Sequence, residues 1–95
     1  MSHGIIVIPD VGAFTIIKEE RKVVEGKTAA RLCLLENLLK KGSKYRVINY
    51  RYKNGPEITM NLGYEEDEYH LAETAFNEIL GNFFDDPGAW YYYNG

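Results

Sequence analysis

Cysteine is almost missing from this chain, and its single thiol, Cys33, cannot form a disulfide within the chain. The cysteine content therefore gives no sign of an oxidising compartment. The sequence also lacks the roughly 18 consecutive apolar residues that cross a bilayer, and it lacks the basic start and apolar core of a signal peptide. These absences predict a cytoplasmic protein that does not associate with a membrane.

Basic residues are missing from the second half of the chain. All 11 Lys and Arg residues lie at or before Lys53, against 5 acids, so residues 1–53 carry a balance of +6. Residues 54–95 contain 9 acids and no base, a balance of −9, and the net charge of −3 hides this asymmetry. A chain of this kind either pairs its two halves internally or exposes one pole to a charged partner.

Motifs of the common enzyme classes are absent too. The sequence has no Gly-rich phosphate loop after a predicted strand, no nucleophile elbow, and no Cys or His pair at ligand spacing. Cys33 lies among leucines without a His positioned to activate it, and His70 stands alone on a polar face. Asp85 and Asp86 precede Pro87-Gly88, a pattern typical of a helix end. We therefore expect no enzymatic activity, no cofactor and no metal site.

The length and composition are those of one folded domain. Ninety-five residues, 45% of them apolar, can form a single core without a disulfide or a metal, but they are too few for two cores. We therefore expect one domain over residues 1–95.

The most regular pattern is an alternation of side chains from Lys44 to Leu62, on either side of Asn54-Gly55. Asn-Gly tolerates the positive φ angles of a tight turn, so this segment is predicted to form a β-hairpin. In its first strand, residues 44, 46, 48, 50 and 52 share one face and residues 45–53 of odd number share the other. In its second strand, Ile58, Met60 and Leu62 are predicted to share the core face.

Two helices are predicted. The first is expected between Thr28, a suitable N-cap, and Lys40-Lys41-Gly42, because its five leucines fall on one arc at 100° per residue. Arg31 falls inside this arc, either reaching past the core edge or held under the sheet by an acid from the C-terminal half. The second helix follows acidic residues 65–68, and its predicted apolar face consists of Leu71, Ala72, Ala75, Phe76, Ile79, Leu80 and Phe83.

The remaining strands are predicted over residues 4–8 and 13–24, with a bulge or break near Glu20. The element order is then β-β-α-β-β-α. This order predicts an α+β fold with an antiparallel sheet of about four strands and two helices packed on one face.

The acidic half suggests a small protein-interaction module, an inhibitor or regulator that occupies a basic site on a nucleic-acid-processing protein. Carboxylates on a rigid helix imitate a phosphate backbone, and nearby aromatic side chains supply buried anchors. This design is typical of small inhibitors from mobile elements, such as anti-CRISPR and anti-restriction proteins. The predicted partner-binding residues are Tyr64, Glu65, Glu66, Asp67, Glu68, Glu73, Glu78, Asp85, Asp86, Trp90, Tyr91 and Tyr92.

Three alternatives stay open. The acidic face can simply be solvated, with the aromatic tail, residues 89–95, folded back onto its own sheet. The tail can instead pair two copies of the chain into a homodimer. Finally, the hairpin interleaves cations with aromatic rings, as single-stranded nucleic acid requires for neutralising phosphates and stacking bases. The residues of this alternative are Lys44, Arg46, Tyr50, Arg51, Tyr52 and Lys53.

Overall fold

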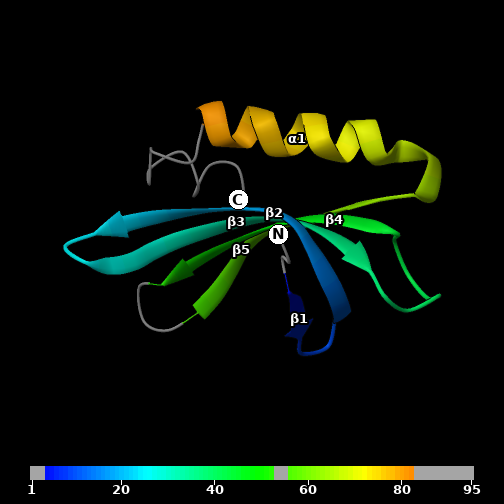
Figure 1. The fold of residues 1–95 in the computed structure, drawn as a ribbon, viewed down its shortest axis with the longest axis horizontal. Coiled ribbons are helices and arrows are strands. Elements are labelled where there is room, and N and C mark those ends of the chain that lie inside the picture. Colours follow the sequence, from blue (N-terminus) through cyan, green and yellow to red (C-terminus); the bar gives the residue numbers. More distant parts are fainter. Residues whose placement is uncertain (1–3, 53–55, 83–95) are drawn as a thin grey trace.

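A computed structural model describes residues 4–52 and 56–82. These residues form an antiparallel sheet of five strands, followed by a short 3₁₀ turn and one helix, so the fold is α+β. Each strand pairs with its neighbours in the sequence, in the order β1-β2-β3-β4-β5, and α1 lies along one side of the sheet (Figure 1). The elements are β1 (Ile5–Ile8), β2 (Gly12–Val24), β3 (Lys27–Asn37), β4 (Tyr45–Tyr52), β5 (Pro56–Tyr64), η1 (Glu66–Glu68) and α1 (Tyr69–Asn82).

The sheet buries side chains on both of its faces. On the side of α1, the core is formed by Ala30, Leu32, Leu34, Val47 and Met60 from the sheet and by Ala72, Phe76 and Ile79 from the helix. On the opposite side a second core contains Ile8, Phe14, Ile16, Cys33, Leu35, Ile48 and Tyr50. Figure 1 shows β1 on the side of the sheet opposite α1, where its Ile8 joins this second core.

The predicted first helix is wrong, because Leu32, Leu34 and Leu35 belong to β3, and exposed Leu38 and Leu39 lie in the loop that follows it. Leu32 and Leu34 point into the helix-side core, whereas Cys33 and Leu35 point into the second core. Alternation is visible in a sequence only when one face of a strand is polar, and a strand buried on both faces reads as a continuous apolar run. The observed order is therefore β-β-β-β-β-α, with five strands in place of about four and one described helix in place of two.

The predicted helix stop is a loop organised by Asn37, the last residue of β3. The buried side-chain amide of Asn37 donates to the carbonyls of Lys41 at 2.9 Å and Ser43 at 3.0 Å. Its Oδ1 accepts from the amide of Leu39 at 2.8 Å. Gly42 adopts a positive φ of 85°, which fits glycine. The side chain of Asn37 thus provides hydrogen-bond partners for three backbone groups of the β3–β4 loop.

The long β2–β3 hairpin closes through Glu25-Gly26, which lie between the paired residues Val24 and Lys27. Both turn residues have positive φ, 53° for Glu25 and 78° for Gly26, as a two-residue hairpin turn requires. In the predicted strand over residues 13–24 the irregularities lie between Ile16 and Lys18 and between Lys22 and Val23, on either side of Glu20. The first of them makes Ile17 an extra residue on β2. Ile17 packs against the helix-side core, and Lys18 follows it on the same side, where it pairs with Glu73 of α1.

The predicted hairpin is confirmed as β4 and β5, which pair from Tyr45–Tyr64 to Tyr52–Pro56, and its turn lies outside the described residues. One of its predicted faces needs correction. Met60 and Leu62 contact the helix-side core, but Ile58 contacts the second core, because the ladder shifts between Asn49 and Tyr50. Thr59 is the extra residue at this shift, and its Oγ1 accepts a hydrogen bond from the side-chain Nδ2 of buried Asn49 at 3.0 Å.

The predicted second helix is present as η1 and α1. Ala72, Phe76 and Ile79 are buried against the sheet, whereas Leu71, assigned to the same face from the sequence, is 42% exposed. Phe83 lies outside the described residues. Neither described helical segment has the length and apolar character of a membrane span.

Replacing Phe76 with Ala is expected to lower the free energy of unfolding by about 3–5 kcal/mol, because it opens a cavity between α1 and the sheet. Phe76 is 3% exposed. The matched control is Leu71→Ala on the same helix, for which a loss of about 1 kcal/mol or less is expected. Urea denaturation followed by circular dichroism measures both, and equal losses would contradict the packing described.

Candidate functional site

The acidic residues predicted to bind a partner begin where β5 leads into the helix. Glu65, Glu66 and Asp67, here called the acidic turn, are exposed. Glu68 is half-buried, and its carboxylate turns back and accepts a hydrogen bond from the backbone amide of Glu65 at 2.7 Å. This contact satisfies a backbone donor that a helix start otherwise leaves unpaired, so it fixes the backbone of the acidic turn.

The next turn is fixed against the sheet. The Tyr69 ring packs edge-on against Tyr45 of β4, with centroids 5.1 Å apart, and its hydroxyl lies 3.3 Å from the Glu73 carboxylate. Burial, with Glu73 nearby, raises the pKa of Tyr69. Glu73 also pairs with Lys18 of β2 at 3.1 Å. The acidic turn therefore stands on an anchored helix.

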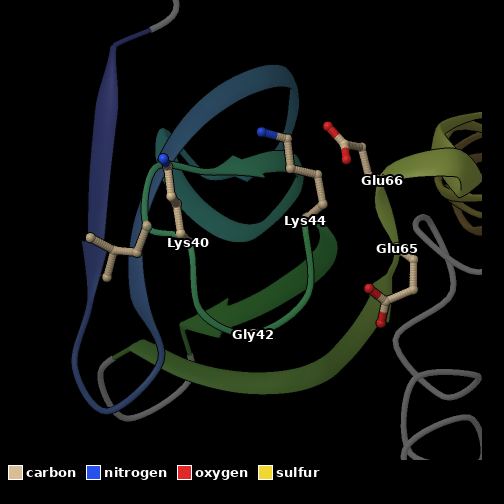
Figure 2. A pocket seen from close by; sticks show the side chains of 6 residues that line it. Lys40, Gly42, Lys44, Glu65 and Glu66 are labelled. Atoms are coloured by element: carbon tan, nitrogen blue, oxygen red, sulfur yellow. The ribbon is translucent and has the colours of Figure 1, made fainter.

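A hollow of about 400 Å³ lies between the β3–β4 loop and the start of the helix. Figure 2 shows Lys40 and Lys44 on the loop side, and Glu65 and Glu66 on the other. Leu39, with an exposed side chain, and Gly42 complete the lining. Lys44 is paired with Glu36 at 3.2 Å, and this hydrogen bond raises the pKa of Lys44.

The two charged halves of the chain compensate each other only in part. Among the described residues, Glu73 of α1 is ion-paired with Lys18 of the sheet, whereas Glu65, Glu66, Asp67 and Glu78 have no cation within ion-pair distance. Glu78 is exposed on α1, and half-buried Tyr64 packs against the helix-side core. The other predicted partner-binding residues lie outside the described residues, namely Asp85, Asp86, Trp90, Tyr91 and Tyr92.

The residues of the nucleic-acid alternative are divided between the two faces of the sheet. Tyr50 is buried in the second core, and Tyr52 stacks on it with centroids 6.1 Å apart. Arg46 donates to Asn61 Oδ1 at 2.8 Å, and Lys44 is paired with Glu36. Arg51 is half-buried and faces the opposite side from Tyr50 and Tyr52, as the alternation predicts, and Lys53 lies outside the described residues. These side chains do not share one exposed surface.

A cluster that the sequence did not reveal joins β2 and β3 beside the second core. Glu19 accepts from the Arg31 guanidinium through Nε and Nη2, and from Arg21 Nε at 3.1 Å. The Arg31 and Glu19 side chains are 19% and 23% exposed, so most of this pair is shielded from water. The acid that holds Arg31 thus comes from the N-terminal half, which corrects the expectation of a partner from the C-terminal half.

Cys33 lies next to this cluster and is fully buried. Its Sγ is 3.9 Å from Glu19 Oε2. Burial is the main cause that raises the pKa of the Cys33 thiol, to about 11. The thiol is therefore protonated at neutral pH.

No group of three or more His, Cys, Asp or Glu residues within residues 4–52 and 56–82 is placed to hold a metal ion. Comparisons of the chain with protein-family models, with curated proteins and with solved structures find no match.

Cys33 is expected to react with a thiol reagent at pH 8 at least about a hundredfold more slowly in the folded protein than in denaturant, because a pKa near 11 leaves few thiolates. The rate in the folded protein should rise with pH up to about 11. Absorbance of the released reagent group measures it, and Cys33 is the only thiol present. Equal rates in the folded and unfolded protein would contradict the burial.

Glu19→Gln is expected to lower the free energy of unfolding by about 1–3 kcal/mol, because it leaves the Arg31 guanidinium short of a charged partner. Glu20→Gln is the matched control on the same strand, since Glu20 is exposed, and about 0.5 kcal/mol or less is expected there. Urea denaturation at pH 7 compares them. A loss no larger for Glu19 than for Glu20 would show that the cluster adds nothing to stability.

Proposed function

We propose that this chain is a non-enzymatic interaction module, an inhibitor or regulator that presents its acidic turn to a basic site on a nucleic-acid-processing protein. The observation that carries the proposal is the run of three exposed carboxylates at Glu65, Glu66 and Asp67, without an ion pair among the described residues. These side chains stay hydrated until a cation of a partner replaces the water.

The rigidity of the acidic turn supports this proposal. The contact of Glu68 with the Glu65 amide and the packing of Tyr69 on Tyr45 hold the backbone in place. A partner then does not have to order the turn on binding, which lowers the entropic cost of association. Acidic groups in a fixed arrangement also steer a basic partner during encounter.

The surroundings of the acidic turn add an apolar side chain to its charges. The hollow beside Glu65 and Glu66 includes the exposed side chain of Leu39. Lysine and arginine side chains combine an apolar stem with a charged head, so a partner's cation can bury its stem there while its head meets the carboxylates. In this proposal the aromatic residues 90–92 provide further contacts.

The test is capture of partners from a cell lysate with the immobilised chain, quantified by mass spectrometry. The variant Glu66→Gln with Asp67→Asn is expected to retain about tenfold less of the specific partner, because it removes two charges from the acidic turn. Glu20→Gln with Glu25→Gln is the matched control, since it removes two charges from exposed positions at the β2–β3 hairpin. Capture by the unmodified chain should also weaken above about 0.15 M salt.

The lysate is treated with nuclease before capture, so that nucleic acid cannot bridge the chain to other proteins. Equal retention by the two variants would reject the acidic turn as the binding surface. Retention that disappears after nuclease treatment would favour the nucleic-acid alternative instead.

A further inference from the structure

The two edges of the sheet differ in how they are protected against pairing with another strand. At one edge, β5 begins with Pro56, which has no N–H, continues with exposed Glu57 and is interrupted by the ladder shift at Thr59. At the other edge, β1 contains only Ile5, Ile6, Val7 and Ile8, in regular register with β2. Proline, charge, irregularity and short length are the usual protections of an edge strand, and β1 has only the last of them.

The outer edge of β1 offers unpaired backbone groups. The carbonyl of Gly4 accepts from the amide of Ile16, so it points toward β2. Backbone groups alternate in direction along a strand, so those of Ile6 also point toward β2, and those of Ile5 and Val7 point outward. Among the described residues no strand pairs with this outer edge.

The side chains of Ile5 and Val7 are exposed as well. They are 67% and 71% exposed, whereas Ile6 and Ile8, on the other face of the strand, contact the second core. Val7 is paired with Ala13, whose carbonyl accepts from the amide of half-exposed Leu38. Exposed apolar side chains on an edge without charge, proline or irregularity mark a contact site for another strand.

We propose that β1 pairs with β1 of a second copy of this chain, antiparallel, about a two-fold axis through Ile6. In this register Ile5 lies opposite Val7 of the other copy, and every outward N–H and C=O of both residues finds a partner. The exposed side chains then form Ile–Val pairs across the interface, which bury apolar surface from water.

Charge and area favour a weak dimer. β1 carries no charge, and exposed Asp10 follows it at one end only, so the two copies of Asp10 lie at opposite ends of the paired strands. A ladder of Ile5, Ile6 and Val7 from each copy is smaller than a standard interface of about 800 Å² per partner, so a Kd of about 100 μM or weaker is expected.

Sedimentation of the full chain from about 10 μM to about 1 mM tests this pairing. The mean mass of the unmodified chain should rise with concentration from the monomer toward the dimer. Val7→Lys should weaken self-association by about tenfold or more, because each dimer loses two cross-strand apolar pairs. The matched control is Val23→Lys on β2, where Val23 is 58% exposed outside the predicted interface, and self-association should stay unchanged.

A crosslink tests the register independently of Val7. In the proposed pairing, residue 6 of each copy is a non-hydrogen-bonded pair with Cα atoms about 4.5 Å apart, within the range for a disulfide. Oxidised Ile6→Cys should form a covalent dimer, whereas Val23→Cys, the control, should not. A mass that stays at the monomer at every concentration overturns the proposal. Self-association that Val7→Lys leaves intact also overturns it. If Val7→Lys is unfolded, the absence of an Ile6→Cys covalent dimer overturns it.

Discussion

The burial of β3 on both of its faces is the constraint on which the rest of the structure depends. Leu32 and Leu34 can leave water only if α1 covers one face, and Cys33 and Leu35 only if the opposite face is also closed. The strand therefore lies at the centre of the sheet, with β2 and β4 as neighbours. Alternation along β2 serves both cores as well, because it places Ile16 in the second core and Ile17 against the helix-side core.

Each of the two cores has an ion pair at its edge. The shielded pair of Arg31 and Glu19 lies beside the second core, where an unpaired guanidinium would be costly. Lys18 and Glu73 connect β2 to the helix at the edge of the other core, both about 40% exposed, so their pairing contributes little to stability. Arg31 and Lys18 are thus paired, while the acidic turn is left without a cation in ion-pair distance among the described residues.

The sequence allowed prediction of those parts of the fold in which a polar face alternates with an apolar one. The hairpin of β4 and β5 and the amphipathic α1 have such faces, and both were predicted with nearly the observed limits. In β3 the polar face is missing, and the leucine spacing matched a helix equally well. The bulge at Thr59 cannot be predicted from the alternation of side chains either, since one extra residue moves Ile58 to the other face.

The candidate site was predictable to a similar degree. The acidic turn follows from composition alone, because Glu65, Glu66 and Asp67 are consecutive acids at a helix start. The Glu19 cluster does not, since it joins Glu19 to Arg31, 12 residues away, through the pairing of β2 with β3, and the leucine spacing predicts a helix in place of β3. The role of Asn37 could not be predicted for the same reason. Its side-chain hydrogen bonds to the loop form only because β3 ends at this residue.

The pairing of every strand with its neighbour along the chain has a consequence for how the protein is made. Contacts between sequence neighbours close short loops, so the hairpins can form one after another during synthesis. The helix that covers Leu32, Leu34 and Val47 comes after all five strands. Until α1 has left the ribosome, the helix-side apolar face of the sheet stays exposed to solvent. This is the interval in which a chaperone would be of most use.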